Sequence, residues 1–266
     1  MLAIILPHID PVLADLGPIQ IRWYSLAYIF GIFFGTSYFQ YVAKTIKIKL
    51  SRDFIDNFII SIIFSIIIGG RLGFILIYNP YYYLTHPIEI LKTWNGGMSF
   101  HGGLLGFCIA TFLVCRNQKI KTMTILDLAA CCAPIGIFLG RVANFINSEL
   151  CGRASDLPWA VIFPSVDSIA RHPSQIYEAL TEGILLFIIL NVALRKYKLY
   201  KYQGILSGLF CILYSLFRFF VETFRQPDEQ LGFVMYHLTM GQLLSILMMI
   251  FGIFITIKSK NSKKFQ

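Results

Sequence analysis

Runs of about 20 apolar residues recur along the chain and are separated by short polar connections. A run of this length is long enough to cross the hydrocarbon core of a bilayer as one helix. The pattern predicts seven such helices, at approximately Ile19–Tyr41, Phe54–Ile77, Met98–Val114, Ile125–Phe145, Ser174–Leu194, Gly204–Phe220 and Met235–Ile257. The predicted fold is therefore an all-α integral membrane protein in which residues 1–266 form a single polytopic domain.

The polar connections alternate in charge. Those after the first, third and fifth predicted helices, together with the end of the chain, hold 15 of the 23 basic residues. These are Lys44, Lys47, Lys49, Arg52, Arg116, Lys119, Lys121, Arg195, Lys196, Lys198, Lys201, Lys258, Lys260, Lys263 and Lys264. Because positive connections stay on the cytoplasmic side, the N-terminus is predicted outside and the C-terminus inside. The outer loops then lie at about residues 78–97 and 146–173.

The composition agrees with a membrane protein. Hydrophobic residues make up 56% of the chain and charged residues 14%, whereas soluble domains carry about 25% charged residues. The net charge of +9 lies mostly in the cytoplasmic clusters, where it anchors the chain to anionic lipid, so no nucleic-acid partner is predicted. The N-terminal MLAIILPHIDP has no basic residue before its apolar stretch and is broken by proline, so it is not expected to be a cleavable signal peptide.

The basic residues outside the cytoplasmic clusters are of a different type. They are Arg22, Arg71, Lys92, Arg141, Arg153, Arg171, Arg218 and Arg225. Seven of these eight are arginine, whereas 12 of the 15 cytoplasmic ones are lysine. Arginine presents a planar fork that binds phosphate or carboxylate through two parallel hydrogen bonds. The cytoplasmic charges therefore indicate topology, and the remaining charges indicate recognition.

The stretch GRVANFINSELCGR, residues 140–153, ends the fourth apolar run with an unusual density of polar groups. On a helix, Arg141, Asn144 and Ser148 share one face, and Glu149 is expected near enough to pair with Arg141. A charge at this depth is costly unless it is paired or faces water. Two interpretations stay open, a salt-bridge network that joins helices or a site for an anion.

A second polar cluster lies in the sixth apolar run. Tyr214, Arg218 and Glu222 are spaced i, i+4 and i+8 along one helical face, and Arg225 follows in FRQPDEQLG. A ladder of this kind taken alone is usually structural. It lies at the same predicted depth as the first cluster, in the outer half of the membrane.

A third cluster begins the fifth apolar run. The segment HPSQIYE places Gln175, Glu178 and Glu182 on one helical face, directly after His172. At the start of the third run, WNGGMSFHGGLLG surrounds His101 with glycines, which allow another backbone or a ligand to approach closely.

Tyr24, in IRWYSLAY, enters the first run at the same outer level. An interfacial anchor is the plain interpretation of this tyrosine. The five clusters at one depth together favour a site for chemistry over separate structural pairs.

These clusters resemble blocks of the bacterial prolipoprotein diacylglyceryl transferase family. GRVANFINSELCG is similar at every fixed position to the family pattern G-R-x-[GA]-N-F-x-N-x-E-x-x-G, with an aliphatic residue or Phe at the second x. IRWYSLAY, GGMSFHGG, RHPSQIYEA and FRQPDEQLG also resemble family blocks and occur in the expected order. The resemblance extends from about Ile19 to the last apolar run.

The resemblance implies an inner-membrane transferase with its active site facing the periplasm, its N-terminus periplasmic and its C-terminus cytoplasmic. Such an enzyme moves the diacylglyceryl group of phosphatidylglycerol to the lipobox cysteine in the signal peptide of a prolipoprotein. A thioether forms and glycerol phosphate is released. The family uses no metal and no organic cofactor.

The family chemistry assigns roles to particular residues. Arg141 and Arg218 are expected to stabilise the charge that develops on the phosphate, and His101 is expected to act as the base for the substrate thiol. Asn144 and Tyr24 are expected to orient the headgroup. The remaining predicted substrate-binding residues are Glu149, Gly152, His172, Tyr214, Glu222 and Arg225, of which Glu149 and Glu222 are expected to hold the arginines in place.

The cysteines of the chain itself have no predicted role. The six form no C-x-x-C pair and five lie inside apolar runs, which is typical of small core residues and gives metal or redox chemistry little support. Cys151 falls on a variable position of the family pattern.

Two other functions are weighed against the transferase. An anion or lipid transporter predicts polar groups in both halves of the membrane and often an internal repeat, and neither is evident here. An intramembrane serine protease would depend on GILSG, residues 204–208, which lies at the predicted cytoplasmic end without a paired histidine. The sequence therefore favours the transferase.

Overall fold

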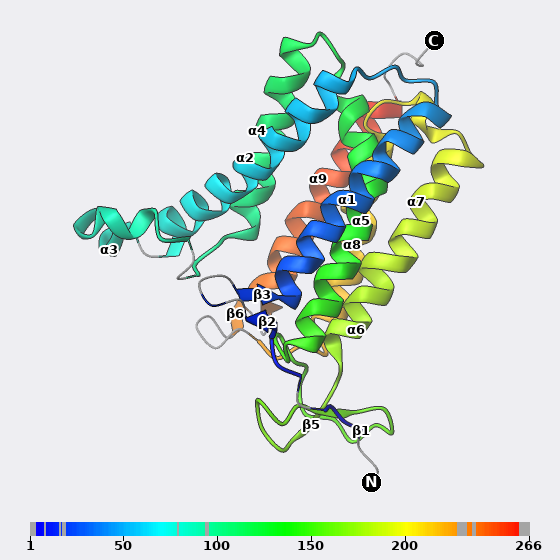
Figure 1. The fold of residues 1–266 in the computed structure, drawn as a ribbon. Helices are drawn as coiled ribbons and strands as arrows, with labels where there is room; N and C mark the ends of the chain where they lie inside the picture. Colours follow the sequence, from blue (N-terminus) through cyan, green and yellow to red (C-terminus); the bar gives the residue numbers. More distant parts are fainter. Residues whose placement is uncertain are drawn as a thin grey trace. The chain divides into compact units, whose positions relative to one another are not determined.

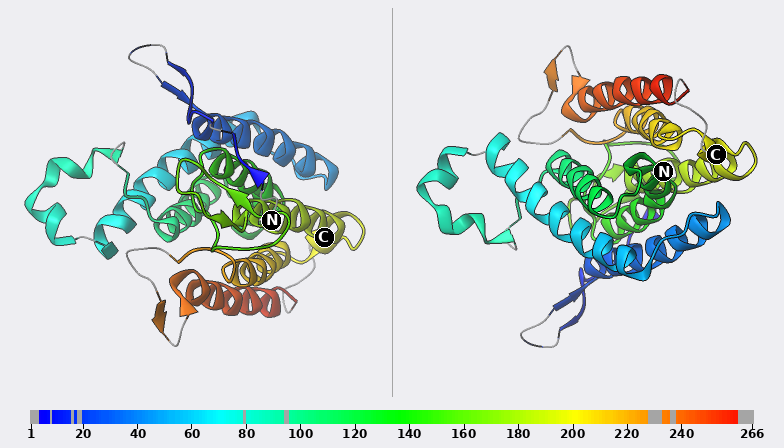
Figure 2. Two further views of the ribbon diagram at one scale, coloured as in Figure 1. Left: turned by 90° about the horizontal axis from the view of Figure 1, so that it is seen from below. Right: turned by 90° about the horizontal axis from the view of Figure 1, so that it is seen from above.

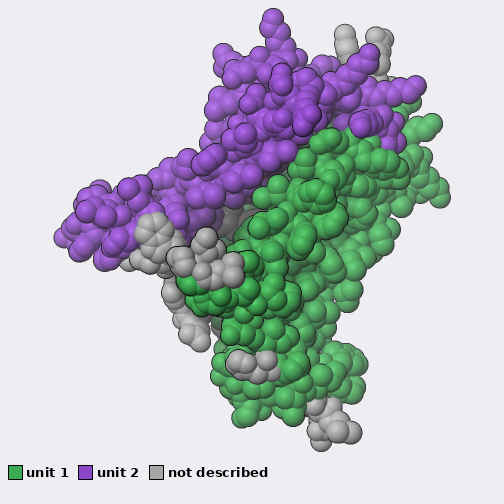
Figure 3. All heavy atoms as spheres, in the orientation of Figure 1, with its two compact units in different colours: residues 1–42, 127–266 green, residues 43–126 purple. Residues whose placement is uncertain are grey.

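The computed structural model describes residues 4–7, 9–15, 17, 20–78, 80–93, 96–227, 233–235 and 238–260. The chain divides into two compact units, which Figure 3 shows in different colours. Unit 1 contains residues 1–42 and 127–266, and unit 2 contains residues 43–126.

Every predicted apolar run coincides with helix in the described part of the chain (Figure 1). The helices are α1 (Trp23–Thr45), α2 (Arg52–Tyr78), α4 (Phe100–Asn117), α5 (Thr122–Ile146), α6 (Ser174–Glu178) with η3 (Ala179–Leu185) and α7 (Leu186–Arg195), α8 (Ile205–Val221) and α9 (Met240–Lys260). Among the described residues, five of these runs are long and apolar enough to cross a membrane, while α4 and α8 contribute shorter apolar helices. The chain is a mostly helical, multi-pass membrane protein.

Short strands modify the all-α prediction. Three strands form a small sheet in the order β1 (Ile4–Ile5), β4 (Val161–Ile162) and β5 (Ala170–Arg171). In this sheet β1 is parallel to β4, and β4 is antiparallel to β5. Two antiparallel hairpins join β2 (Val12–Asp15) to β3 (Gln20–Arg22) and β6 (Phe233–Met235) to β7 (Leu238–Thr239). Strands of two to four residues are too short to produce a readable alternation of apolar and polar positions.

Unit 2 is built on the close packing of α2 against α4, which lie side by side in both views of Figure 2. Glycines allow this approach, because a Cβ at Gly73 would lie 2.7 Å from the Cα of Gly102, and a Cβ at Gly69 would lie 3.1 Å from the Cα of Gly106. Small residues spaced four apart are the usual solution for tight helix pairs in membranes. Gly102, the residue after His101, therefore serves a helix contact.

Arg71 organises the rest of unit 2. Its buried guanidinium donates from Nε to the carbonyl of Ile90 at 3.0 Å and from Nη2 to that of Lys92 at 3.2 Å. Further bonds go to the carbonyls of Glu89, Gly96 and Gly97. These bonds tie the segment that contains α3 (Pro80–Thr85) and η1 (Pro87–Ile90) to α2.

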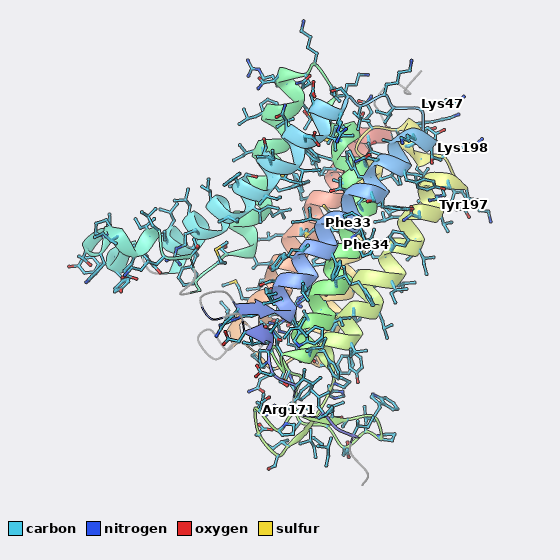
Figure 4. The ribbon with its side chains drawn as sticks, in the orientation of Figure 1. Phe33, Phe34, Lys47, Arg171, Tyr197 and Lys198 are labelled. Atoms are coloured by element: carbon cyan, nitrogen blue, oxygen red, sulfur yellow. The ribbon has the colours of Figure 1, made fainter. Side chains whose placement is uncertain are left out.

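Unit 1 presents apolar side chains outward and polar groups at its ends. Phe33 and Phe34, labelled on α1 in Figure 4, are exposed, as expected of residues that face lipid. Lys198 and Arg171 lie at opposite ends of this unit in the same view. A lysine of one predicted cytoplasmic connection and an arginine of a predicted outer loop therefore lie at opposite ends of unit 1.

Candidate functional site

Three arginines and three glutamates meet in the interior of unit 1. This arginine–glutamate cluster consists of Arg141 of α5, Glu178 of α6, Glu182 of η3, Arg218 of α8, and Glu222 and Arg225 after α8. The two signs of charge are equal in number, so the cluster is formally neutral. Its residues come from three separate segments of the sequence, which are the end of α5, the run of α6 and η3, and the end of α8 with the residues after it.

Glu178 is bound by all three arginines. Its Oε2 lies 3.1 Å from Nη1 of Arg141, its Oε1 lies 3.3 Å from Nη1 of Arg225, and Arg218 Nη1 donates to the same Oε1. The Glu178 side chain has no exposed surface. A carboxylate enclosed in this way fixes the positions of three guanidinium groups at once.

Glu182 is bound less completely. Its Oε2 accepts from Nη2 of Arg141 at 3.1 Å, whereas its Oε1 lies 3.9 Å from Nη1 of Arg218. That Oε1 is buried and has no hydrogen-bond partner among the described residues. Oε2 of Glu178 likewise has no hydrogen bond among the described residues, but it lies 3.1 Å from Arg141, and Oε1 of Glu178 accepts from both Arg218 and Arg225.

The local conformation of the fifth apolar run places these glutamates. Between α6 and α7 the chain passes through the π-helical turn η3 (Ala179–Leu185). A π turn inserts one residue into a helix and shifts the face that follows, and such turns are frequent at functional sites. Gly183 in this turn lies against α5, where a Cβ would be 2.8 Å from the Cβ of Phe138. The close approach brings Arg141, one turn after Phe138, to Glu182.

Glu222 is fixed by the start of α9. Its Oε2 lies 2.6 Å from Nη2 of Arg218, and its Oε1 accepts from Thr239 Oγ1 at 3.0 Å. Thr239 also accepts from the backbone N–H of Gln242 at 3.2 Å, and the Gln242 side chain accepts from the backbone N–H of Thr239 at 3.1 Å. This reciprocal pair is a capping box for α9. The predicted pairing of Glu222 with an arginine is confirmed.

In the centre of the cluster the arginine side chains are partly exposed and the glutamate side chains are buried. The side chains of Arg141 and Arg218 are 17% and 13% exposed, whereas those of Glu178 and Glu182 are fully enclosed. Removing one partner of a buried ion pair costs about 3–5 kcal/mol, so the carboxylates hold the guanidinium forks firmly. A guanidinium fork suits a planar or tetrahedral anion such as phosphate, and both arginine side chains keep a small accessible part.

The prediction that Glu149 pairs with Arg141 is wrong. Glu149 accepts from Asn144 Nδ2 at 3.0 Å and from Asn147 Nδ2 at 3.2 Å, whereas the ion-pair partners of Arg141 are the two glutamates of the cluster. Asn144 is buried and also accepts the backbone N–H of Glu149 at 2.9 Å. Asn144 and Glu149 therefore form a polar group of their own.

The end of α5 explains this error. The helix stops at Ile146, and Ser148 and Leu150 follow with φ values of 56° and 58°. A left-handed residue after a helix turns the chain away from the helix axis. The helical face that carries Arg141 on α5 therefore does not extend to Glu149.

Gly152 lies where three backbone segments meet and are joined by backbone hydrogen bonds. Its N–H donates to the carbonyl of His172 at 3.1 Å, and the N–H of Arg153 donates to the carbonyl of Phe224 at 2.8 Å. A Cβ at Gly152 would lie 2.7 Å from the Cβ of His172 and 2.8 Å from the carbonyl of Phe224. This junction holds the start of the segment that follows α5 against the residues that contain Arg225.

Arg171 is paired within the segment between α5 and α6. It binds the carboxylate of Asp167, and its Nη1 donates to the carbonyl of Gly152 at 3.1 Å and to Oε1 of Gln226 at 2.6 Å. The hydrogen bond from Arg171 lowers the pKa of Asp167 and raises the pKa of Arg171 itself. Arg171 is therefore a structural link and not a free cation.

His172 belongs to an aromatic group. Its ring centre lies 5.1 Å from that of Phe224, and its Nδ1 is 3.3 Å from the hydroxyl of Tyr177, which also accepts from Trp159 Nε1 at 2.8 Å. Burial lowers the pKa of His172, so the neutral ring is favoured at pH 7. Its predicted role in substrate binding stays a prediction.

The remaining predicted residues lie in different settings. Tyr24, at the start of α1, accepts from the hydroxyl of Tyr28 at 3.2 Å, and Tyr214 is buried on α8 and stacks on Phe210 at 5.7 Å. His101 is the second residue of α4, in unit 2. Its side chain lies outside the described part of the chain, so its role as a base stays a prediction.

Cys151 packs in a small apolar cluster with Leu6, Val161 and Phe163. Burial raises the pKa of its thiol, which disfavours the reactive thiolate. That Cys151 takes no part in chemistry stays a prediction.

The sequence did not single out Glu178 and Glu182 as site residues. Their shared helical face in HPSQIYEALTE was readable, because several charged positions on one face of an apolar run require partners. The partners themselves lie about 40 residues away in the sequence. Thr239 and Gln242 form a T-x-x-Q pattern before an apolar run, which is a readable signal for a helix start, but nothing in the sequence connects Thr239 to Glu222.

The fold and the cluster define a multi-pass helical membrane protein whose interior holds paired arginines and glutamates. Comparison with known proteins agrees. Residues 11–258 match the family model described as prolipoprotein diacylglyceryl transferase.

Curated relatives named phosphatidylglycerol–prolipoprotein diacylglyceryl transferase are similar over almost the whole chain. The protein of Rickettsia bellii strain OSU 85-389 is 47% identical over 254 residues, which cover 96% of this chain and 97% of the relative. The protein of Rickettsia akari strain Hartford is 48% identical over 253 residues, which cover 95% of this chain and 98% of the relative. The chain belongs to the prolipoprotein diacylglyceryl transferase family.

Proposed function

We propose that this chain transfers the diacylglyceryl group of phosphatidylglycerol to the cysteine thiol of a prolipoprotein lipobox. The C–O bond between the diacylglyceryl carbon and the phosphate oxygen breaks, and a C–S bond forms at the same carbon. Glycerol phosphate leaves with the bonding electrons, and the thiol proton passes to a base. The names and near-complete coverage of the curated relatives support this reaction.

The observation that carries the proposal is that Arg141 and Arg218 contact the same two glutamates. They come from α5 and α8 and are held by the same two carboxylates, with part of each side chain accessible. The phosphodiester of the donor carries one negative charge, and departure of glycerol phosphate adds charge to it. Donors that bind more strongly as this charge develops lower the barrier, whereas equal binding of donor and transition state only lowers KM.

The nucleophile comes from the substrate. A cysteine thiol has an ordinary pKa near 8.5, so it needs a base or a positive field to form the thiolate. His101 is the proposed base, because its ordinary pKa lies close to the working pH. Replacing His101 with Gln is expected to lower transfer by about 10²–10⁴-fold, and retention of most activity from pH 6 to pH 9 would exclude this role.

We place the enzyme in the bacterial inner membrane with seven spans, its N-terminus in the periplasm and its C-terminus in the cytoplasm. The distribution of lysine supports this orientation. The arginine–glutamate cluster lies towards the end of the unit 1 helices that leads to Arg171, opposite Lys198 (Figure 4). We therefore place the active site on the periplasmic side.

Purified protein tests the proposal directly. The protein in detergent is mixed with phosphatidylglycerol radiolabelled in its acyl chains and a peptide that contains a lipobox cysteine. Transfer of label to the peptide, and none to a peptide with serine in place of the cysteine, is the expected result. An unlabelled cysteine peptide from a folded sample would reject the function.

A further inference from the structure

We propose that Glu182 is an internal competitor for the phosphate of the lipid. It holds Arg141 and Arg218 while the site is free of lipid, and it yields them when the phosphate binds. The inference rests on the proposed function, because it concerns the same arginines.

The two central glutamates are held unequally. Glu178 contacts three arginines through both of its oxygens. Glu182 has one contact of 3.1 Å, to Arg141, and its second oxygen stays 3.9 Å from Arg218 without a hydrogen bond. Each glutamate has one buried oxygen without a hydrogen bond among the described residues, but Glu178 accepts two hydrogen bonds from arginines and Glu182 accepts one. Fewer bonds are therefore lost when Glu182 releases its arginines than when Glu178 does.

The charges of the cluster require one carboxylate to yield. Three guanidiniums and three carboxylates are balanced, so an incoming phosphodiester gives a net negative charge beside two fully enclosed glutamates. Like charges placed together at a desolvated contact cost several kcal/mol. Carboxylate and phosphate oxygens use the same guanidinium fork, so the phosphate can take the position of a carboxylate on Arg141 and Arg218.

The surroundings of Glu182 and Glu222 single out Glu182. Glu222 is retained by Thr239 as well as by Arg218. The charged and titratable groups that act on Glu182 are Arg141 from α5, Arg218 and Tyr214 from α8, and Glu178 from its own helix. Glu178 repels it and also anchors both of the arginines it would release, so the forks keep their places when Glu182 moves.

The same competition acts on the product. Glycerol phosphate carries one more negative charge than the donor phosphodiester once it is fully ionised. The return of Glu182 to Arg141 then weakens product binding and helps glycerol phosphate to leave. Glu182 is in this sense a positioning residue, and it takes no direct part in bond formation.

Matched variants in the transfer assay test this inference. In Glu182→Gln, the shape is kept and the competing charge is removed, so KM for phosphatidylglycerol should fall by about tenfold. The inhibition constant of glycerol phosphate should fall by a larger factor, because the product has more charge. In the control, Glu178→Gln, the anchor of three arginines is weakened, so KM should rise and kcat should fall.

The inference is overturned when Glu182→Gln leaves KM and the inhibition constant unchanged or raises both, as expected for Glu178→Gln. A second variant applies when Glu182→Gln does not fold. Glu182→Asp keeps the charge but shortens its reach, so it should lower KM by a smaller factor, and a raised KM would reject the inference. Failure of the proposed function is separate, because the unmodified protein would then transfer no label.

Discussion

Arg71 in unit 2 and Arg141 in unit 1 are both arginines inside apolar helices, but their partners differ in kind. Arg71 donates to backbone carbonyls of the segment 89–97 and lies 5.1 Å from the ring centre of Tyr83. Arg141 is bound by two carboxylates and keeps part of its side chain accessible. The sequence places both arginines in the same class, outside the lysine clusters.

The difference shows how a membrane protein uses one residue type for two purposes. Carbonyl oxygens of a folded segment cannot leave without unfolding it, so the donors of Arg71 are committed to structure. Carboxylates of side chains can rotate away, and a phosphate oxygen is an equivalent acceptor. The type of acceptor therefore separates a structural arginine from one available to a ligand.

The largest effect is expected from Arg141→Lys. Lysine keeps the charge but loses the fork, so transfer per folded molecule should fall by about 10²–10³-fold, as for loss of one donor to a developing anion. The assay with labelled phosphatidylglycerol measures this rate. Arg71→Lys is the matched control and should lower the yield of folded protein, with transfer per folded molecule retained. Equal losses of rate in both variants would remove the distinction.

The second largest effect is expected from Arg71→Met, which should lower the stability of the folded protein. Each buried carbonyl left without a donor costs about 1–3 kcal/mol, so a total loss on the order of 3 kcal/mol is expected. Thermal unfolding in detergent measures this loss, and limited proteolysis should find new cleavage within residues 80–97. Lys92→Met is the control, because the Lys92 side chain pairs with Glu89 alone among the hydrogen bonds and ion pairs described for it. Protection of residues 80–97 in Arg71→Met would contradict the structural role.

A smaller effect concerns Arg171, a structural arginine whose partner is a carboxylate. The pKa of Asp167 is lowered in the fold by the hydrogen bond from Arg171. A lowered acid pKa stabilises the fold above the unfolded value, near 3.9, and this stabilisation is lost as pH falls through the folded value. Hydrogen exchange in residues 153–171 should therefore increase below about pH 4, after correction for the intrinsic rate. In Asp167→Asn, exchange at pH 7 should already be faster and should lack this acid dependence. An unchanged acid response would assign the stability to other groups.

The smallest effect is expected from Cys151→Ser. The thiol is enclosed in an apolar cluster and its pKa is raised by burial, so transfer per folded molecule should be nearly unchanged. The same assay and a measurement of membrane abundance check this expectation. Loss of transfer at normal abundance would place Cys151 in the mechanism.

The helices could be predicted from the sequence because each apolar run extends over many residues. An error of a few residues at its ends does not change the prediction that the run is a helix. Trp23 and Met240 begin α1 and α9 later than predicted because the preceding residues form the short strands β3 and β7. Arg218 and Glu222 were readable as a pair because a helix places residues four apart together. The partners of Arg141 were not readable, because α5 ends before Glu149 and no local rule connects residue 141 to residues 178 and 182.

The sequence by itself determined that the chain crosses a membrane, which connections between the apolar runs carry lysine, and which family the chain resembles. These properties depend on composition and on local spacing, which the chain carries wherever it folds. Only the tertiary structure decided that Arg71 is bound by carbonyls and that Arg141 and Arg218 share two enclosed glutamates. The physical reason is that the acceptors of a buried guanidinium come from segments distant in sequence, and packing alone brings them within hydrogen-bond range.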